Sequence, residues 1–385
     1  MTKYFDALET RSADEREAAQ VAALQGLGVS VQALADLTSL PVLRKAELSE
    51  RQKAEPPFGG LRVGKVSHVF QSPGPIYEPG GLTGDWFRMG RFLYAAGFGP
   101  DDIVQNCFGY HLTPAGHMFE SGALAVGARV LPAGTGQTEL QVRAAADIGT
   151  TAYAGTPDYL KVILDKADEM GIPLKLSKAA VGGGALFPSL RAEYAERGIS
   201  CLQCYATADL GNIAYESDAM EGMILDEGVI VEIVTPGTGD PVPEGEVGEV
   251  VVTPLNPDYP LVRFATGDLS AILPGQSPCG RTAPRIKGWM GRADQTTKIK
   301  GMFVRPEQVA ALVAQHDEVS RARVIARRQG EQDQMTVQIE SPGGDPAGYA
   351  ASVANVLKLK GEVEIHAPGS LPRDGLVIED QRTYD

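Results

Sequence analysis

Two short segments carry side chains suited to holding a nucleotide. Tyr205 ends an apolar run, and its flat ring offers a surface on which a purine ring can stack. Asp209 follows it closely, where a carboxylate can hold a divalent cation against phosphate oxygens. Asp268 lies at an expected turn, where its two oxygens can accept both hydroxyls of a ribose. The plainer alternatives are a buried tyrosine, a helix-capping aspartate and an aspartate in a hairpin turn.

A third segment is rich in glycine. Gly182, Gly183 and Gly184 come at the end of an expected strand and are followed by Ala185 and an expected helix. Because these glycines have no side chains, this stretch of backbone can approach a bound ligand closely. Packing alone gives little reason for three consecutive glycines, so the sequence predicts a ligand contact here.

The composition excludes several classes of protein. The chain has 385 residues, and 35 Lys+Arg against 49 Asp+Glu give a net charge of -14, which disfavours nucleic acid and anionic membrane surfaces as partners. Hydrophobic residues make up 43% and charged residues 22%, as in ordinary globular proteins. We expect a cytoplasmic protein, because the sequence shows neither an apolar run of membrane-spanning length nor the basic and apolar start of a secretory signal.

The four cysteines are too few and too scattered to form a disulfide framework. Cys201 and Cys204 have the spacing of a redox pair or of half a zinc site, but the chain has no second pair with this spacing. We interpret them as two ordinary thiols on or near a strand.

The spacing of apolar residues predicts an α/β fold. Helices are expected in the first 65 residues, at Ala13 to Leu24 and from about Pro41 onward. From Val66 to about Val234, short apolar runs alternate with helical stretches, which predicts βαβ units and a mostly parallel sheet. Beyond Val229, tight turns between strands predict a β-rich subdomain. Its expected strands are Val229 to Val234, Val247 to Thr253, Leu261 to Phe264 and Leu269 to Leu273.

This pattern predicts three domains. They are a helical N-terminal cap (1–65), a large domain (66–292) with the β-rich subdomain at about 229–290, and a small α+β C-terminal domain (293–385). The expected elements of the last are a helix at Glu307 to His316, strands at Ser320 to Arg327 and Gln334 to Glu340, a helix at Pro346 to Leu359 and a strand at Val363 to His366.

The order of the motifs resembles that of a known family. Tyr205-Ala-Thr-Ala-Asp209 is followed by Pro260-Leu-Val-Arg-Phe-Ala-Thr-Gly-Asp-Leu269 and then by Gly291-Arg-Ala-Asp-Gln-Thr-Thr-Lys-Ile-Lys-Gly301. These segments resemble those of the adenylate-forming (AMP-binding) enzymes, most closely the phenylacetate-CoA ligase family. Cys279-Gly-Arg-Thr-Ala-Pro-Arg-Ile286 resembles a segment particular to that branch, and the resemblance covers the chain from about Phe58 to its end.

The resemblance implies ATP or AMP, Mg²⁺ and coenzyme A as ligands. Asp209 would hold the Mg²⁺, Asp268 the ribose, and Arg292 the ribose or a phosphate. Asp294 would be the hinge about which a mobile C-terminal domain turns between adenylation and thioester formation, with an ordinary linker as the alternative. The candidate catalytic residues are Asp209, Arg292, Lys298 and Arg373. The other implied contacts of the nucleotide or coenzyme A are Ser72, Gly74, Gly182, Gly183, Gly184, Ala185, Tyr205, Ala206, Thr207 and Lys300.

The acid substrate is expected to lie against two loops. By resemblance, Tyr110 and His111 lie near the carboxylate of the acid, and Thr156 precedes a helix along the acyl pocket. A histidine beside a tyrosine is alternatively a structural residue. Tyr153 and Gly155 complete the expected substrate pocket, and aromatic side chains in this region favour a pocket that accepts an aromatic acid.

The chain departs from the family in two catalytic segments. The family's phosphate loop is rich in Ser, Thr and Gly and ends in Lys, whereas the matching stretch, Phe70 to Gly81, has neither a Thr pair nor a Lys. Its Glu78 would repel a triphosphate. Leu376 stands where the family has its C-terminal catalytic Lys, and an aliphatic side chain cannot neutralise charge that develops on the α-phosphate. Arg373 would replace that lysine in part.

The leading hypothesis is an AMP-forming acyl-CoA ligase that activates an aromatic, phenylacetate-like or other small carboxylic acid and transfers it to coenzyme A. The departures leave two alternatives, a degenerate relative that binds AMP or acyl-CoA as a sensor and a ligase with another acyl acceptor. The expected partners are the small acid and coenzyme A, with a possible homodimer. Ser217 and Ile224 stand where relatives carry zinc ligands, so no zinc is expected.

Overall fold

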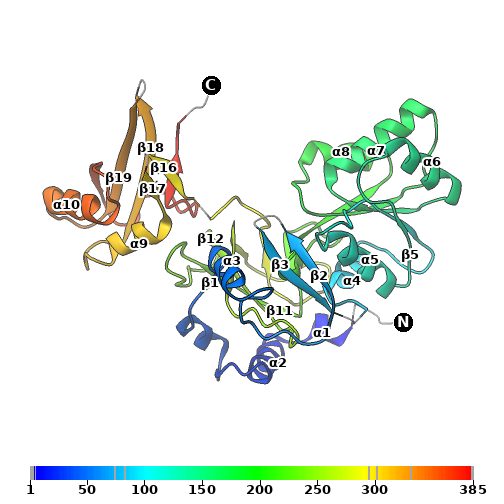
Figure 1. Ribbon diagram of the computed structural model, residues 1–385, viewed down its shortest axis with the longest axis horizontal. Helices are drawn as coiled ribbons and strands as arrows, with labels where there is room; N and C mark the ends of the chain where they lie inside the picture. Colours follow the sequence, from blue (N-terminus) through cyan, green and yellow to red (C-terminus); the bar gives the residue numbers. More distant parts are fainter. Residues whose placement is uncertain are drawn as a thin grey trace. The chain divides into compact units, whose positions relative to one another are not determined.

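The computed structural model describes residues 4, 6–72, 75–81, 84–293, 295–300, 302–329 and 332–382. The chain divides into two compact units, each traced in Figure 1. The first unit comprises Met1–Val231, Val252–Phe264 and Leu273–Gly288, and the second comprises Glu232–Val251, Ala265–Ile272 and Trp289–Asp385. None of the described helices is both long and apolar enough to cross a lipid bilayer.

A mostly parallel sheet carries the first unit, as the alternating pattern predicted. Within the described residues the sheet has nine strands, in the order β14-β15-β10-β9-β8-β7-β6-β4-β5. The parallel strands are β4 (Ile103–Asn106), β5 (Arg129–Pro132), β6 (Ala152–Gly155), β7 (Lys178–Val181) and β8 (Ser200–Thr207). The remaining strands are β9 (Gly211–Tyr215), β10 (Met223–Leu225), β14 (Ile272–Leu273) and β15 (Arg285–Ile286).

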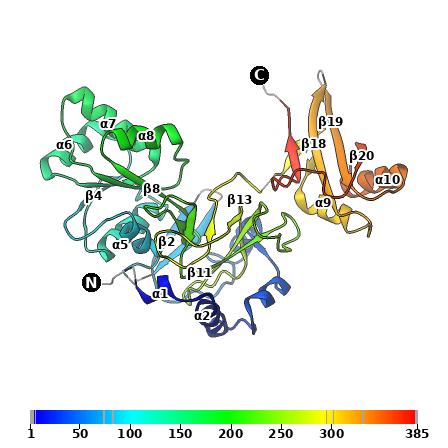
Figure 2. The same cartoon turned by 180° about the vertical axis from the view of Figure 1, so that it is seen from behind.

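Helices cover both faces of these parallel strands. In Figures 1 and 2, α4 and α5 lie on one side and α6, α7 and α8 on the other. Successive residues of a strand point to opposite faces. Accordingly, Ala152 and Ala154 of β6 pack with α4 and α5, whereas Tyr153 between them packs with α7 and α8. The helices are α4 (Met89–Ala95), α5 (Ala115–Ala125), α6 (Thr138–Ile148), α7 (Pro157–Met170) and α8 (Pro188–Glu196).

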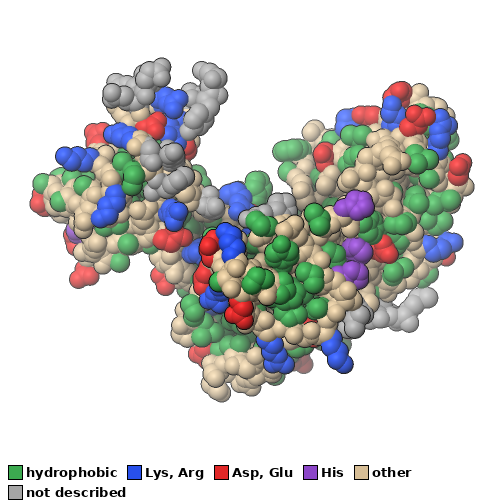
Figure 3. Space-filling view, viewed as in Figure 1, with side chains coloured by type: hydrophobic (Ala, Val, Ile, Leu, Met, Phe, Trp, Pro, Cys, Tyr) green, Lys and Arg blue, Asp and Glu red, His purple; other side chains and the backbone are tan. Residues whose placement is uncertain are grey.

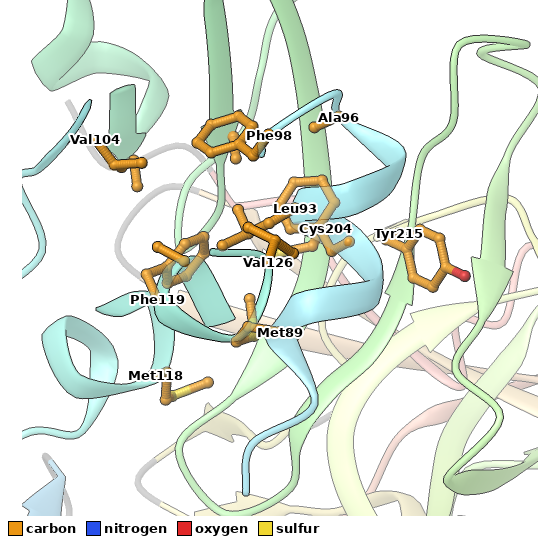
Figure 4. Close-up of a cluster of buried hydrophobic side chains, with 14 of the residues drawn as sticks. Met89, Leu93, Ala96, Phe98, Val104, Met118, Phe119, Val126, Cys204 and Tyr215 are labelled. Atoms are coloured by element: carbon orange, nitrogen blue, oxygen red, sulfur yellow. The ribbon is translucent and has the colours of Figure 1, made fainter. Parts of the chain in front are cut away.

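Figure 4 shows part of the hydrophobic cluster that packs α4 and α5 against the sheet. Met89 and Leu93 of α4 meet Phe119 of α5 above the strands, and each of the three is at most 3% exposed. Burying side chains of this size contributes roughly 1.5–3 kcal/mol each, before the cost of ordering them. This cluster therefore fixes α4 and α5 on the sheet.

The N-terminal segment is helical, as expected, and a buried glutamate attaches it to the first unit. Its elements are α1 (Ala7–Thr10), α2 (Ala13–Gly26), the 3-10 helix η1 (Leu34–Ser39), the short strand β1 (Leu43–Arg44) and α3 (Lys45–Ala54). Glu9 of α1 is 1% exposed, accepts a hydrogen bond from the hydroxyl of Tyr215, and pairs with Nε of Arg281 at 3.0 Å. The helix expected near Pro41 begins later, at Lys45, because Leu43 and Arg44 are extended.

A hairpin follows α3 where the phosphate loop was expected. It consists of β2 (Val66–Ser72) and β3 (Ile76–Gly81), which pair antiparallel so that Ser72 lies opposite Ile76 and Phe70 opposite Glu78. The segment is therefore built mainly of paired backbone, and its side chains alternate between the two faces of the ribbon.

The β-rich part contains three longer strands, which share a four-stranded sheet with β1 in the order β1-β13-β12-β11. They are β11 (Val229–Val234), β12 (Gly248–Pro254) and β13 (Phe264–Ser270). The expected strand from Leu261 to Phe264 is wrong, because Arg263 has a φ of 49°, in the left-handed region, and β13 begins only after it. The expected strand from Leu269 to Leu273 is likewise two elements, the end of β13 and β14.

The C-terminal part of the second unit has the predicted order of elements. The elements are β16 (Thr297–Ile299), β17 (Met302–Val304), α9 (Pro306–Val313), β18 (Arg321–Gln329), β19 (Gln332–Glu340), α10 (Pro346–Val356), β20 (Glu362–His366) and β21 (Ile378–Asp380). Four of them form a sheet in the order β20-β19-β18-β21, in which β21 pairs parallel with β18. Sequence reasoning missed β21, which is only three residues long.

Candidate nucleotide-binding site

Two of the expected nucleotide contacts leave the sheet at the same edge. Val181, the last residue of β7, lies opposite Gln203 of β8 and Gly155 of β6. Gly182–Ala185 and Tyr205–Asp209 therefore emerge from the carboxyl ends of neighbouring parallel strands. Ligands of open α/β sheets bind outside this edge.

The glycine segment after β7 presents backbone to solvent, as a ligand contact requires. Gly183, Gly184 and Ala185 are exposed, while Gly182 is buried. Gly183 has a φ of +69°, a conformation that residues with a side chain rarely adopt. A Cβ added to Gly182 would lie 3.0 Å from Sγ of Cys204, so close packing also restricts that position to glycine.

The end of β8 is irregular where the predicted adenine contact lies. The pairing of β8 with β9 shifts register between Tyr205 and Ala206, and such bulges redirect side chains. Tyr205 is 9% exposed, whereas Ala206 and Thr207 are half-buried. The backbone N–H of Leu210 donates to Oγ1 of Thr207 at 3.2 Å, which closes the turn that leads to Asp209.

Asp209 lies in a buried polar cluster. It is 4% exposed, and its Oδ2 pairs with Nζ of Lys45 at 2.9 Å. Among the described residues, neither its other oxygen, Oδ1, nor the hydroxyl of Tyr259 has a hydrogen-bond partner, and both atoms are buried. Burial and the nearby Asp209 carboxylate raise the pKa of Glu78 to about 7. Sequence reasoning assigned the metal-binding role to Asp209 but missed Lys45, which lies 164 residues earlier in the chain.

The hairpin residue Ser72, an expected phosphate contact, is engaged within the protein. Its hydroxyl donates to Oε1 of Glu78, and its backbone N–H donates to Oε2 of the same side chain at 3.2 Å. Glu78 is fully buried, so the carboxyl that was expected to repel phosphate faces the protein interior. Gly74, the other expected contact in this hairpin, lies outside the described residues.

The expected acid-binding loops lie where the order of strands in the sheet reverses. The chain runs from β4 to β5 on one side and then returns to β6 on the other side of β4. A crevice opens at such a point in parallel sheets. Tyr110 and His111 follow β4, and Thr156 follows β6. The hydroxyl of Tyr110 accepts a hydrogen bond from Nδ2 of Asn106 at 2.7 Å, and burial raises the pKa of Tyr110.

Two further residues of the expected substrate pocket, His111 and Tyr153, have opposite exposures. His111 is exposed. Tyr153 is fully buried in the hydrophobic cluster of α7 and α8, and its hydroxyl donates to the backbone oxygen of Thr156 at 3.0 Å. Its hydroxyl also occupies the space beside Gly155, where an added Cβ would lie 2.1 Å away. The Tyr153 ring is thus part of the hydrophobic core.

Histidines gather beside these loops on one face of the first unit, where Figure 3 shows them in purple. The rings of His68 and His117 are 5.1 Å apart, and the ring of His117 meets that of Tyr110 edge-on at 5.2 Å. Burial, with a smaller contribution from His68, lowers the pKa of His117. The ring of His117 is therefore predominantly neutral at neutral pH and adds aromatic surface near Tyr110.

The second unit holds the predicted ribose contact in a preformed arrangement. Nη1 of Arg292 and the indole Nε1 of Trp289 both donate to Oδ1 of Asp268, at 2.8 and 3.0 Å. The backbone N–H of Ala293 donates to the oxygen of Gly267 at 2.8 Å, which holds the two segments together. The sequence predicted Asp268 and Arg292 separately, but gave no signal for Trp289.

The other predicted residues of the second unit are distributed over several elements. Asp294 and the side chain of Lys298 lie outside the described part of the chain, and Lys300 is exposed. Arg373 forms an ion pair with Glu246. Leu376 is half-buried, and its backbone N–H donates to Oδ1 of Asp374 at 3.0 Å.

Gln295, which sequence reasoning missed, holds the segment around Leu376. Its Nε2 donates to the oxygen of Gly375 at 2.9 Å, and its Oε1 accepts from the N–H groups of Val377 and Ile378 at 2.5 and 2.8 Å. One side chain therefore satisfies three backbone groups on either side of Leu376.

The cysteines carry no shared site. Cys201 and Cys204 are free thiols on β8, and they pack into clusters on opposite faces of the sheet. This confirms two ordinary thiols on a strand. Within the described ranges, no three His, Cys, Asp or Glu side chains converge as metal ligands would. Ser217, at an expected zinc-ligand position, instead hydrogen-bonds the thiol of Cys279.

The fold of the chain is that of the adenylate-forming CoA ligases. The fold is shared with 2-hydroxyisobutyryl-CoA ligase in its postadenylation state, with a TM-score of 0.70 and 24% identity over 97% of this chain and 91% of that one. The same ligase in its thioesterification state gives a TM-score of 0.68 and 23% identity, over 98% of this chain and 92% of that one.

Curated sequences define the family. A phenylacetate-coenzyme A ligase of Thermus thermophilus is 30% identical over 326 residues, covering 80% of this chain and 72% of the relative. A phenylacetate-coenzyme A ligase of Escherichia coli is 28% identical over 329 residues, covering 80% and 73%. No protein-family model matches the chain. The chain belongs to the phenylacetate-CoA ligase family.

Proposed function

We propose that this protein is an AMP-forming acyl-CoA ligase that activates a small carboxylic acid, with aromatic acids of the phenylacetate type as its first candidates. The observation that carries the proposal is the position of Gly182–Ala185 and Tyr205–Asp209 at the carboxyl edge of a parallel sheet, in a member of this family. Curated relatives named for phenylacetate support the substrate class.

The reaction has two steps. A carboxylate oxygen of the acid attacks the α-phosphorus of ATP, the bond from that phosphorus to the β-phosphate oxygen breaks, and pyrophosphate leaves with the electron pair. The thiolate of coenzyme A then attacks the acyl carbon, and AMP leaves with the electrons of the acyl–oxygen bond. Positioning and charge stabilisation supply most of the catalysis of such transfers.

Several of the predicted residues have a proposed role in these steps. The ring of Tyr205 and the backbone of Gly182–Gly184 hold the adenine, and Asp268 accepts the ribose hydroxyls with Arg292 beside it. Asp209 holds Mg²⁺, which supplies positive charge to the phosphate oxygens when bound. Its buried, unpaired Oδ1 fits this role, because hard divalent cations take carboxylate oxygens as ligands.

A second candidate function is a sensor that binds AMP or acyl-CoA without turnover. Two observations favour it: Ser72 and Glu78 of the hairpin bind each other, and Leu376 replaces a cationic side chain. An aliphatic group offers no stabilisation to a phosphate in transfer. The cytoplasmic location and the homodimer stay predictions.

The test is pyrophosphate release from the purified chain with ATP, Mg²⁺ and a panel of acids that includes phenylacetate and 2-hydroxyisobutyrate, each with and without coenzyme A. Pyrophosphate release with one acid, together with its CoA thioester by mass spectrometry, supports the ligase. Release without thioester formation points to another acyl acceptor. Clear AMP binding by calorimetry with no release for any acid contradicts the ligase and supports the sensor.

A further inference from the structure

Lys45 is the first residue of α3 and reaches into the cluster around Asp209. Its Nζ lies 2.9 Å from Oδ2 of Asp209, whose side chain is 1% exposed, while the Lys45 side chain itself is 39% exposed. The ammonium group therefore sits at the boundary between a buried carboxylate and solvent. A ligand that approaches Asp209 from solvent meets this ammonium group.

The position of Lys45 does not serve the stability of its own helix. The N-terminus of a helix carries a partial positive charge, so a cation in the first turn is unfavourable by about 0.3–1 kcal/mol. The N-cap residue of α3 is another cation, Arg44, and its side chain makes no capping hydrogen bond. The charge of Lys45 therefore needs another explanation, which the buried carboxylate of Asp209 provides in part.

Hydrogen bonds attach α3 to the hairpin that lacks a lysine. Nε2 of Gln52 donates to the oxygen of Tyr77 at 2.8 Å, and Oε1 of Gln52 accepts from the N–H of Tyr77 at 2.8 Å. Gln52 is 3% exposed, so both bonds are shielded from water. The hydroxyl of Ser49 adds a bond of 3.4 Å to the oxygen of Pro75. The helix that carries Lys45 is thus fixed to the β2–β3 hairpin.

A phosphate group that enters this cluster lies near two acidic side chains and needs a positive charge beside it. The ammonium of Lys45 can supply that charge if it turns toward the phosphate. Asp209 and Glu78 are both buried, and the ammonium of Lys45 pairs with Asp209 at 2.9 Å. The Oδ1 of Asp209, which no described residue hydrogen-bonds, can coordinate a metal ion. A Mg²⁺ ion held by Asp209 would offset the charge of that carboxylate and would leave the ammonium of Lys45 free to pair with phosphate oxygens.

We propose that Lys45 is the phosphate-binding cation of this enzyme, supplied by α3 in place of the lysine that the hairpin lacks. The inference rests on the proposed function, because it takes a nucleotide triphosphate as the ligand. Lys45 pairs with Asp209 in the free protein and binds the β- or γ-phosphate of ATP in the complex.

The experiment measures the binding of ATP, AMP and adenosine by calorimetry, with Mg²⁺, to the full chain and to Lys45→Met. A charge-assisted hydrogen bond contributes about 1.5–3 kcal/mol, so we expect the variant to bind ATP roughly 10- to 100-fold more weakly. Adenosine has no phosphate and should bind within about 2-fold of the unmodified chain, because Lys45 touches neither base nor ribose. Lys45→Arg should recover most of the ATP affinity.

Two controls separate phosphate binding from general damage. Lys53→Gln removes an exposed lysine of the same helix, whose partner is the exposed Glu50, and should leave all three affinities unchanged. Removal of Lys45 leaves the Asp209 carboxylate buried without a counterion, which can prevent folding. Lys45→Met/Asp209→Asn, compared with Asp209→Asn alone, removes that charge and still reports the loss of ATP affinity due to Lys45.

The outcomes are distinct. A lower melting temperature with an unchanged ratio of ATP to adenosine affinity overturns the inference and makes Lys45 a structural counterion of Asp209. A loss of ATP affinity with adenosine binding retained supports it. If the unmodified chain binds adenosine but shows neither ATP binding nor pyrophosphate release, the proposed function itself has failed, whatever the variants do.

Discussion

Arg292 and Trp289 donate to the same carboxylate oxygen of Asp268, at 2.8 and 3.0 Å. The Asp268 side chain is 12% exposed, while that of Arg292 is 55% exposed. The carboxylate is therefore oriented before a nucleotide arrives, and the guanidinium remains accessible to solvent. An orientation of this kind reduces the entropy lost on binding.

The first prediction concerns the recognition of ribose by Asp268. Asp268→Ala removes the group that we propose accepts the two hydroxyls, and we expect ATP to bind roughly 10- to 100-fold more weakly. The variant should also lose its preference for ATP over 2′-deoxy-ATP, which calorimetry measures directly. A retained preference would show that another group recognises the 2′-hydroxyl. Asp258→Ala, which changes a carboxylate of the first unit, is the control.

The second prediction concerns the pH dependence of stability. The pKa of Glu78 is raised from 4.5 to about 7 in the folded protein, mainly by burial. A raised pKa means that the stabilising contribution is full below about pH 4.5 and is lost as the pH rises through 7. The side chain of Glu78→Gln cannot ionise. Between pH 5 and pH 8 the unfolding free energy of this variant should therefore fall by about 1–3 kcal/mol less than that of the unmodified chain.

Urea unfolding at the two pH values measures this difference. Glutamine has one acceptor oxygen for the two donors of Ser72, where the carboxylate has two, but the cost of losing one acceptor is the same at both pH values and cancels in the comparison. The exposed Glu47 gives the matched control, Glu47→Gln, which should follow the unmodified chain. Parallel pH profiles for the chain and Glu78→Gln would mean that Glu78 ionises normally.

The third prediction concerns Gln295 and the segment that it holds. Gln295→Leu leaves the N–H groups of Val377 and Ile378 and the oxygen of Gly375 without their partner. Unsatisfied buried groups cost about 1–3 kcal/mol each. Hydrogen exchange at Val377 and Ile378 should therefore accelerate by roughly 10-fold or more, while β19 stays protected. Gln315→Leu, at an exposed position, is the control and should leave hydrogen exchange at both residues unchanged. Unaltered exchange in Gln295→Leu would show that Gln295 does not hold this segment.

The fourth prediction uses two neighbouring glycines. Gly183 has a φ of +69°, so Gly183→Ala should lower the unfolding free energy by about 1 kcal/mol and weaken AMP binding. Gly184 has no such φ, and an added Cβ would meet Pro157 at 3.4 Å, an ordinary contact. Gly184→Ala should therefore fold normally. Thermal melts and AMP titrations of both variants decide the matter, and equal effects would mean that the backbone conformation is unimportant.

Local patterns predicted the parallel sheet because one continuous stretch of sequence forms each βαβ unit. Pro157 begins α7, and Gly171 ends it with a φ of 66°. The failed strand at Leu261 to Phe264 shows the limit of such patterns. Its residues are apolar enough for a strand, but Arg263 turns into the left-handed region and its side chain donates to the oxygens of Thr38 and Leu40, far away in sequence.

The candidate site shows the same contrast between local sequence patterns and contacts over long sequence distances. Asp209 and Asp268 could be identified as candidates because each lies in a short motif. Lys45 was not, because its partner is 164 residues away and a lysine at a helix start carries no chemical signal of its own. Glu78 was predicted to repel a triphosphate, and only the structure shows that it faces inward and binds Ser72.

The different surroundings of the four cysteines give this chain a native labelling position. Burial raises the pKa of Cys107, Cys201 and Cys204, so these thiols are protonated and shielded at neutral pH. Burial acts in the same direction on Cys279, but hydrogen bonds from Ser217, Ser277 and Arg281 outweigh it and lower its pKa. Because the thiolate is the nucleophile, a maleimide dye will attach first at Cys279. Arg281 also binds Glu9, so the dye will report detachment of the N-terminal segment without any cysteine being removed.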